Sequence, residues 1–399
     1  MSSLGPQPPL PRVLWPLMFG NFVIATGVMM VTGILTEVSI SLNVSIATAG
    51  QMISTSALCT CIGAPLFAAW AAGWDRQKLL TASLLWYSVL HALAACSEQF
   101  SALLGWRALA MAGAAIFTPQ AASCVGLLVP AEQRGRAITF IFLGWSIASV
   151  LGTPLGAWLG GTFGWRYAFA FISMLSLVSG LWLWRTLPTG IVPPALSRAA
   201  WSTTLGSRTM MLTVSVTMVS AAGQFILFSY LAPYLKNIMG ASTTTLSLLL
   251  LMYGLFGFIG NAFIARHIDR IGPSRSVMIS LGCMVCGLAL WTVAGSAAWL
   301  AWAFLPWGLG VFSANSAQQA RLVQLAPDLA SASVALNSSA IYAGQALGAA
   351  MGGWIVLHQG LTALPPFALL GMVLAMVVSW QSSRYARSHP LPQHAAQQG

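Results

Sequence analysis

Long apolar segments recur along the whole chain and are separated only by short polar or basic pieces. A helix needs about 20 mostly apolar residues to cross the hydrocarbon core of a bilayer. Helices are the natural way to cross, because all their backbone hydrogen bonds are internal and lipid supplies no partners. Twelve segments meet this requirement. They are 15–36, 47–70, 79–97, 101–122, 137–160, 167–185, 210–235, 243–265, 276–296, 299–321, 332–356 and 364–382.

The composition agrees with an all-α polytopic membrane protein embedded in a lipid bilayer. The chain is 57% hydrophobic and only 6% charged, whereas soluble domains carry about 25% charged residues. The first apolar segment follows the polar, proline-rich "MSSLGPQPPLPR". That segment is longer than the hydrophobic region of a signal peptide, so we expect it to remain as the first membrane helix.

The net charge of +11 is distributed in a way that indicates orientation in a membrane. With the amino terminus in the cytoplasm, the opposite side holds only Arg166 and Lys236, and Arg107 falls inside a span. The remaining basic residues are cytoplasmic: Arg12, Arg76, Lys78, Arg134, Arg136, Arg185, Arg198, Arg208, Arg266, Arg270, Arg275, Arg321, Arg384 and Arg387. This asymmetry follows the positive-inside rule. It predicts that both termini are cytoplasmic and argues against a nucleic-acid partner.

A polar segment at 186–208 divides the chain into two halves of six spans. It contains three prolines and two arginines, the composition of a linker. The expected organisation is a tail at 1–14, a bundle at 15–185, the linker at 186–208, a second bundle at 209–382 and a tail at 383–399. The halves also repeat. "GAPLFAAWAAGWDRQK" starts at Gly63, and "GNAFIARHIDRIGPSR" starts 197 residues later, a pattern typical of secondary transporters.

Small residues recur every fourth position in the fifth and eleventh spans. The glycines and the proline concerned are Gly144, Gly152, Pro154 and Gly156, then Gly344, Gly348 and Gly352. Positions four apart share one helix face, and small side chains allow close helix approach. Static packing and a face on which the two halves slide both explain the pattern. Pro154 removes a backbone donor, so we expect a kink there.

The segment 266–275, "RHIDRIGPSR", concentrates four charged residues in a nearly uncharged chain. Gly272 permits a tight turn between two spans. Arg266, Arg270 and Arg275 serve as topology anchors under the positive-inside rule, but Asp269 is not needed for topology. We therefore interpret the segment as a latch. A partly buried charge pair of this kind breaks cooperatively when its partners separate.

With these motifs in place, the chain resembles the major facilitator superfamily, in particular its twelve-helix drug/proton antiporter branch. The resemblance extends over all spans and is nearest to arabinose-efflux, purine-ribonucleoside-efflux and chloramphenicol-resistance-like permeases. It rests on "RHIDRIGPSR", on "GWSIASVLGTPLGAWLGG" at 144–161 and on Arg107 in "GWRALAMAGAA".

The resemblance implies that the Asp269 loop is a cytoplasmic gate. In the first half Ala72 replaces the motif's aspartate, so Asp75 and Arg76 would have to serve there instead.

No acidic residue lies near the middle of any predicted span. The six are Glu37, Asp75, Glu98, Glu132, Asp269 and Asp328, all at span edges or in loops. The ionisable candidates within spans are His91 and Arg107. His91 is either a proton carrier, since histidine titrates near neutral pH, or a hydrogen-bonded residue near the outer interface. A charge inside a span is costly and usually functional, so Arg107 is expected to contact substrate or take part in coupling.

Neutral amides are the other polar groups expected around a central cavity. They are Asn21, Gln120, Gln224, Asn315, Gln318, Asn337 and Gln345. Amides offer both donors and acceptors, which suits sugars, nucleosides or neutral amphiphiles. Each amide could instead form a hydrogen bond between helices. We predict that together with Arg107 they line a substrate-binding cavity.

These features predict a secondary active transporter that exports a small neutral or weakly anionic molecule by alternating access, powered by a proton gradient. The alternative is a proton-independent facilitator or exchanger of a polar metabolite. No catalytic nucleophile with a base or nucleotide-binding loop is visible, which argues against an enzyme. Cys283 and Cys286 have a metal-ligand spacing but no nearby histidine, so we expect no metal or other cofactor. One chain is expected to suffice for transport.

Overall fold

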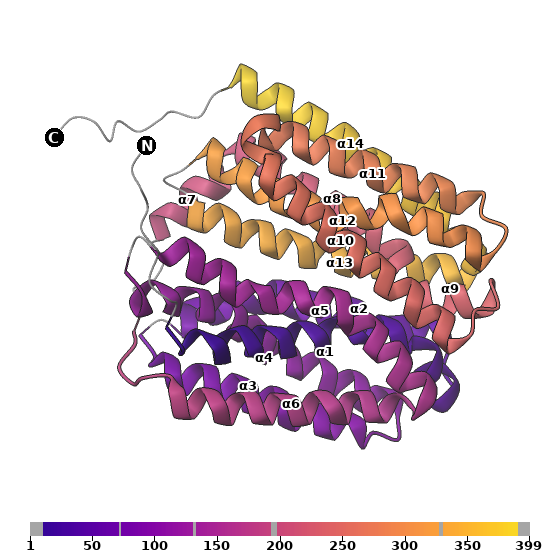
Figure 1. The fold of residues 1–399 in the computed structure, drawn as a ribbon, viewed down its shortest axis with the longest axis horizontal. Coiled ribbons are helices and arrows are strands. Elements are labelled where there is room, and N and C mark those ends of the chain that lie inside the picture. The colour runs from indigo at the N-terminus through magenta and orange to yellow at the C-terminus, as the bar shows by residue number, and fades with distance from the viewer. Residues whose placement is uncertain (1–10, 72, 131–132, 193–197, 327–329, 390–399) are drawn as a thin grey trace.

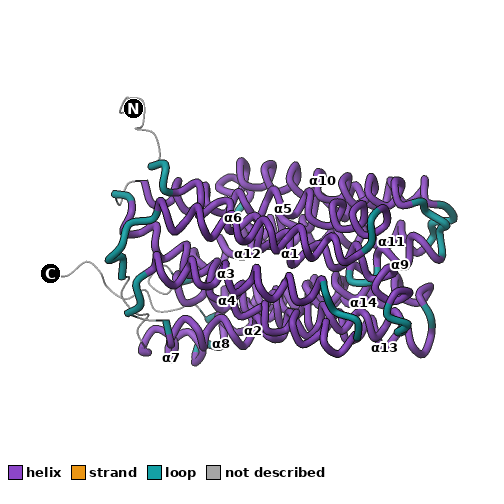
Figure 2. The backbone as a smooth tube through the Cα atoms, turned by 90° about the horizontal axis from the view of Figure 1, so that it is seen from below, coloured by secondary structure: helices purple, strands orange, loops and turns teal. Residues whose placement is uncertain are grey.

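The computed structural model describes residues 11–71, 73–130, 133–192, 198–326 and 330–389. Within these ranges the regular structure is helical, and twelve long helices run alongside one another (Figures 1 and 2). Eleven segments of the described chain are long and apolar enough to cross a membrane. The remaining long helix, α12 (Ala297–Leu325), has the length of a spanning helix and carries several polar side chains in its second half. The protein is therefore a multi-pass membrane protein, which confirms the predicted fold class.

The first bundle occupies the lower half of Figure 1. Its helices are α1 (Leu14–Ser41), α2 (Ile46–Trp70), α3 (Arg76–Ala95), α4 (Phe100–Leu128), α5 (Arg134–Thr162) and α6 (Trp165–Thr186). Helix α1 packs on α5 and α6, α3 packs on α4 and α6, and α2 packs on α4. The pairing of α3 with α4 positions Arg107, a buried cation of this bundle.

The second bundle fills the upper half of Figure 1. Its elements are α8 (Arg208–Phe228), α9 (Leu231–Asn237), α10 (Thr243–Ile271), α11 (Pro273–Thr292), α12, α13 (Ala330–Gln359), the short 3₁₀ helix η3 (Leu361–Ala363) and α14 (Leu364–Ser388). Helix α8 packs on α13 and α14, while α12 packs on α10 and α11. We call the end of the molecule that carries helix α7 (Arg198–Gly206) the linker end, and the opposite end the distal end.

The helices differ from the expected spans in three places. Part of the expected linker is helical, as α7. The seventh span breaks into α8 and α9, because Pro233 cannot donate a hydrogen bond to the carbonyl of Ser229, four residues earlier. Helix α1 continues to Ser41, beyond the expected edge at residue 36, and this extension places Glu37 on a helix.

Local sequence signals account for where several helices begin. Ser207, Ser242 and Ser296 cap α8, α10 and α12, each accepting from the backbone N–H three residues later at 3.4, 3.1 and 3.2 Å. Gly272 separates α10 from α11 with φ of 85°, a conformation that favours glycine, and Pro273 starts α11. This is the tight turn that the sequence predicts.

The glycine stripes pack inside each bundle. A Cβ atom at Gly156 of α5 would lie 2.5 Å from the Met30 carbonyl oxygen of α1, and one at Gly344 of α13 would lie 2.3 Å from that of Met218 on α8. Gly144, Gly152, Gly348 and Gly352 face the same two partner helices. The structure therefore favours static packing over a sliding face for these residues. Helix α5 continues through Pro154 from Arg134 to Thr162.

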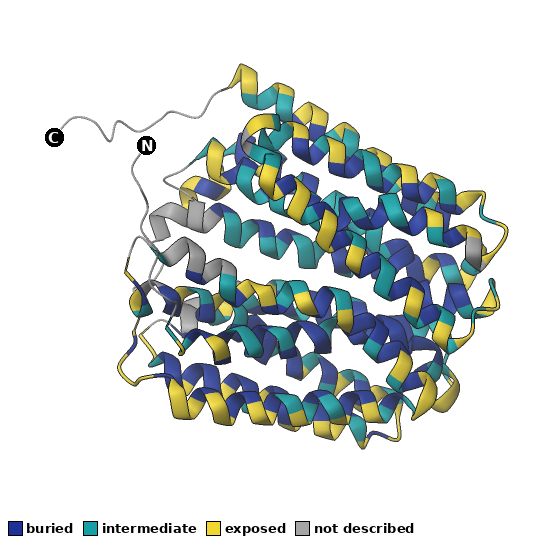
Figure 3. Ribbon diagram, viewed as in Figure 1, coloured by how far each residue is buried: buried dark blue, intermediate teal, exposed yellow. Residues whose placement is uncertain are grey.

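The two bundles meet through α5 against α10 and α2 against α13. A Cβ atom at Gly254 would lie only 2.5 Å from the Cα atom of Val150, and one at Gly161 would lie 2.5 Å from the Cγ2 atom of Thr243. These contacts extend from the middle of the molecule to the distal end. Exposed large apolar side chains such as Trp302 cover the outside of both bundles, where lipid would contact them (Figure 3).

Candidate functional site

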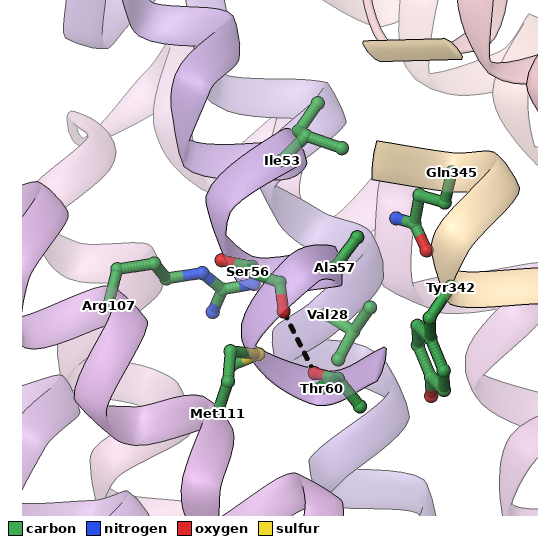
Figure 4. A pocket seen from close by; sticks show the side chains of 9 residues that line it. All are labelled: Val28, Ile53, Ser56, Ala57, Thr60, Arg107, Met111, Tyr342 and Gln345. Atoms are coloured by element: carbon green, nitrogen blue, oxygen red, sulfur yellow. Dashed lines mark hydrogen bonds between the residues drawn. The ribbon is translucent and has the colours of Figure 1, made fainter. Parts of the chain in front are cut away.

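A small cavity lies between the two bundles (Figure 4). It is lined by Val28, Ile53, Ser56, Ala57, Thr60, Arg107, Met111, Tyr342 and Gln345. Helix α4 supplies Arg107 and Met111, and α13 supplies Tyr342 and Gln345 from the opposite bundle. The space open to the centre of a water-sized sphere is about 10 Å³, close to the minimum for one water molecule. The structure thus shows the cavity in a contracted state.

Arg107 is the buried cation of this cavity, with 2% of its surface exposed. Its Nη1 donates a hydrogen bond to Nε2 of His91 at 3.1 Å, and the Tyr87 hydroxyl interacts with the same guanidinium. Its Nε has no hydrogen-bond partner among the residues that the structure describes. No acidic side chain pairs with Arg107 within the described ranges. The ion pair found in these ranges joins Lys236 and Glu37. A cation held inside the membrane without an anion usually has a function.

His91 fixes the guanidinium through a single tautomer. Its Nδ1 lies 2.8 Å from the carbonyl oxygen of Tyr87. A carbonyl can only accept, so Nδ1 carries the hydrogen, and Nε2 is left with a lone pair that accepts from Arg107. The neutral imidazole therefore satisfies both contacts, whereas the doubly protonated ring cannot.

The local sequence explains why these three side chains meet. Tyr87 and His91 are four residues apart on α3 and share one helix face, with ring centroids 4.0 Å apart. Helix α4 approaches this face closely, because Gly113 lets its backbone pack against α3, and a Cβ atom there would lie 2.6 Å from the Ser83 carbonyl oxygen. Close packing of the two helices brings Arg107 to the imidazole.

Tyr342 and Gln345 face Arg107 from the second bundle (Figure 4). They are three residues apart on α13, so both project from the same side of that helix. Neither side chain has a hydrogen-bond partner in the part of the chain that the structure describes, although Gln345 is only 8% exposed. A hydroxyl and an amide with free hydrogen-bonding capacity thus stand opposite a cation that also has a free donor.

The other predicted amides lie away from the cavity. Asn337 accepts from the Thr217 hydroxyl at 2.5 Å and donates to Oδ1 of Asn315 at 3.2 Å, which links α8, α12 and α13. Gln318 of α12 donates to the Thr213 carbonyl of α8. These three amides join helices of the second bundle in this structure, and their role in binding substrate stays a prediction.

The remaining amides also join helices. Asn21 of α1 donates to the Ile141 carbonyl of α5 at 3.1 Å, and Gln224 of α8 donates to the Tyr253 hydroxyl of α10 at 2.9 Å. Gln120 differs from these two, because it is buried and accepts from Ser123 of its own helix α4. Of the seven amides, Gln345 is the one among the described residues that line the cavity.

The expected gate residues near the linker end form contacts within the first bundle and the linker. Asp75 caps α3 by accepting from the Lys78 amide, and also accepts from the Gly190 amide. Burial acts to raise the pKa of Asp75, but these amide hydrogen bonds outweigh it and hold the pKa below its ordinary value. Arg76 donates to the carbonyls of Ala71 and Trp74, both at 2.9 Å. In this structure Asp75 thus joins the linker to α3 and Arg76 binds the turn before α3, and their role in the gate stays a prediction.

In the second half, Arg270 and Arg275 are exposed. The side chain of Asp269 lies outside the described residues, so the structure does not place the pair that the latch requires. Arg321, expected in a cytoplasmic segment, is instead buried on α12, where it donates to the hydroxyls of Ser379 and Ser382 at 3.5 and 2.9 Å.

An ion pair that the sequence analysis missed joins the bundles at the distal end. Lys236 of α9 binds Glu37 of α1. This contact is the one ion pair formed within the described ranges. The two side chains are 17% and 14% exposed. Two signals point to this pair. Lys236 is one of only two basic residues expected outside the cytoplasm. Glu37 lies 199 residues before it, close to the repeat offset.

We expect Glu37→Gln to shift the protein toward a state that is open at the distal end. Removing one partner of a partly buried pair costs about 1–2 kcal/mol, which corresponds to about a tenfold shift in the conformational equilibrium. Spin labels on the distal ends of α2 and α13 would report the change, because a larger fraction of molecules would show a long distance between the two labels. The charge-swapped double variant Glu37→Lys with Lys236→Glu should restore short distances. Unchanged label distances in Glu37→Gln would mean that the pair does not hold the bundles together.

Twelve long helices of the described chain form two bundles, and a cavity lined by a buried cation lies between them, an architecture typical of membrane transporters. The family model of the Major Facilitator Superfamily matches residues 17–349. The chain belongs to this superfamily.

Relatives and solved structures agree with this assignment. The chain is 26% identical over 374 residues to a probable sugar efflux transporter of Pasteurella multocida (strain Pm70), covering 92% of each chain. It is 25% identical to the uncharacterised MFS-type transporter YbcL of Bacillus subtilis (strain 168), covering 90% of this chain and 92% of that one.

Among solved structures, a bacterial homologue of the human lysosomal transporter Spinster, in an inward-facing conformation, matches with a TM-score of 0.78. It is 16% identical and covers 96% of this chain and 98% of that one. A D-xylose–proton symporter matches with a TM-score of 0.73 at 17% identity, covering 92% of this chain and 97% of that one. These likenesses show the fold.

Proposed function

We propose that this protein exports a small uncharged or weakly anionic molecule, such as a sugar, by alternating access and in exchange for protons. The observation that carries the proposal is the unpaired Arg107 in a cavity formed by both bundles. A ligand that contacts Arg107 on α4 and Gln345 on α13 would bridge the two bundles. The sugar efflux transporter among the relatives supports the substrate class.

The lining of the cavity suits a polyhydroxylated ring. Arg107, Tyr342 and Gln345 supply hydrogen-bond donors, and the last two also supply acceptors. Apolar side chains such as Met111 and Ile53 complete the wall and can pack on the face of a ring. Among the described residues no carboxylate lines the cavity, so a lipophilic cation would lack a counter-charge there.

The contacts between the bundles suggest which side of the membrane the structure faces. The bundles are joined at the distal end by Lys236 and Glu37 and by Tyr230, whose hydroxyl donates to the Ala349 carbonyl at 3.0 Å and contacts Gly50 of α2. The basic residues are concentrated toward the linker end, which we assign to the cytoplasm of a bacterial inner membrane. The contracted cavity would then open toward the cytoplasm and receive its substrate there.

Ligand-dependent thermal stability of the purified protein tests this function. A ligand that binds only the folded state raises the melting temperature by mass action, with a stabilisation of about 2.7 kcal/mol at a hundredfold excess over Kd. The panel contains pentoses, nucleosides, chloramphenicol-like drugs, carboxylates and lipophilic cations. We expect stabilisation by a neutral or anionic compound. Stabilisation by lipophilic cations alone would contradict the proposed substrate class.

A further inference from the structure

We propose that His91 is a positioning residue for Arg107 whose protonation competes with substrate: a proton on His91 and an uncharged ligand on Arg107 exclude one another. The inference rests on the proposed function, because it uses Arg107 as the ligand-binding group. It adds the site at which a proton acts on that group.

Two hydrogen bonds of His91 hold Arg107 in place, and the imidazole can form both of them only while it is neutral. Nδ1–H donates to the Tyr87 carbonyl at 2.8 Å, and the lone pair of Nε2 accepts from Nη1 of Arg107 at 3.1 Å. A proton that adds to Nε2 occupies this lone pair. The hydrogen bond from Arg107 is lost, and two positive charges face each other across the former contact. The guanidinium must then leave its position.

When His91 is protonated, Arg107 is the neighbouring group that must move, because the other side chains around the imidazole cannot compensate the new charge. On its own helix, the titratable neighbour is Tyr87, whose hydroxyl donates to the Ile24 carbonyl of α1 at 3.3 Å. From α6 the imidazole meets the apolar ring of Phe169, with centroids 5.8 Å apart. From α13, Tyr342 lies within electrostatic reach of Tyr87. None of these side chains carries an anionic charge at neutral pH that could compensate a second cation.

An uncharged ligand requires the positioned guanidinium. Arg107 uses Nη1 for His91 and keeps Nε without a partner, so a ligand can bind the remaining donors while the contact with His91 persists. Once His91 is protonated, this arrangement is lost. An uncharged ligand gains little from the additional positive charge on His91. The displacement of Arg107 therefore decides whether ligand affinity rises or falls. Acidification weakens binding.

Competition between proton and ligand at one site produces exchange. A proton that reaches His91 from the distal side would release the ligand there, and a ligand arriving from the linker end would favour the neutral imidazole. The chain needs no carboxylate in the middle of a span for this cycle, which agrees with the positions of its six acidic residues.

Two histidines of the same chain provide matched controls. In His358 and in His267, Nδ1 bonds the carbonyl four residues earlier at 2.8 Å, as it does in His91, but His358 is exposed and His267 is only half-buried. They share the local helical contact of His91 and lie outside the cavity.

The first experiment reads the tautomer and needs no ligand. Nitrogen NMR of the full-length protein labelled with ¹⁵N-histidine gives the protonation of each ring nitrogen, and His91→Gln assigns the His91 signals. At pH 8 we expect a protonated Nδ1 and a bare Nε2, with the Nε2 resonance changed in Arg107→Met. A protonated Nε2 at pH 8, or an Nε2 resonance unaffected by Arg107→Met, overturns the proposal.

The second experiment measures binding of arabinose at pH 8 and pH 5 to folded protein, as judged by its melting curve. We expect wild-type affinity to be lower at pH 5 than at pH 8. His91→Gln keeps an acceptor but cannot titrate, so its binding should not change with pH and should exceed that of His91→Leu. His358→Gln should behave like the wild type. An equal pH dependence in His91→Gln overturns the proposal.

Arabinose that fails to bind the wild type at either pH would count against the proposed function for pentoses. The tautomer measurement would still decide the role of His91.

Discussion

Replacing Arg107 with glutamine is expected to abolish transport, with a loss of at least about a hundredfold, while the protein still inserts and folds. Hydrogen bonds to charged groups contribute about 1.5–3 kcal/mol each. The variant loses the hydrogen bonds between the guanidinium and the ligand, and it loses the positive charge with which the first bundle binds a ligand held by both bundles. It also leaves Nε2 of His91 without its donor. The measurement is transport in proteoliposomes of the compound that stabilises the wild type.

Two further variants sharpen this result. Arg107→Lys retains the charge but not the planar fork, so an intermediate loss of about tenfold is expected. Arg384→Gln provides the control, because Arg384 is exposed at the end of α14, stacks over Trp380 and does not line the cavity. Transport at the wild-type rate by Arg107→Gln would show that the cavity is not the substrate site.

Gly254→Leu is expected to stop transport by preventing the bundles from closing at the distal end. The added Cβ atom would lie 2.5 Å from the Cα atom of Val150 and 2.8 Å from the carbonyl oxygen of Ser149. Both are backbone atoms, so the clash is relieved only if α10 separates from α5. Each bundle keeps its own core, and the protein should therefore remain folded.

Spin labels across the distal end measure the separation directly. We expect Gly254→Leu to lose the short-distance population and to transport at background rates, since the cycle needs both conformations. Gly282→Leu is the matched control: Gly282 lies within α11, and a Cβ atom there would meet no atom within 4 Å. If Gly254→Leu retained the short distances, α5 and α10 would not be the surfaces that close.

The expected spans agree closely with the helices because hydropathy is a local property. Each apolar segment must form internal backbone hydrogen bonds in lipid, whatever its neighbours are. The same argument located Arg107 and His91 inside spans, since a charged or titratable residue in an apolar segment is visible without any structure. The break at Ser229 was missed, because one proline within a long apolar run resembles those that helices tolerate, such as Pro154 in α5.

The amides show where local reasoning stops. Asn21, Gln224 and Asn337 are as polar as Gln345 and also lie within predicted spans, yet they bond neighbouring helices of their own bundle. Which face of a helix points at a neighbour and which at the cavity depends on the rotation of that helix in the packed bundle. Glycine contacts such as that of Gly344 with Met218 set this rotation, and they involve residues more than a hundred positions apart.

The sequence by itself determined that the chain spans a membrane with helices in two related halves, because hydropathy, charge asymmetry and repeats are properties of the order of residues. Only the tertiary structure decided that His91 holds Arg107, that Gln345 faces it from the other half, and that Glu37 and Lys236 join the halves at the distal end. The physical reason is that hydrogen bonds and ion pairs act over about 3 Å. The packing of whole helices, and not their order in the chain, brings such groups within that distance.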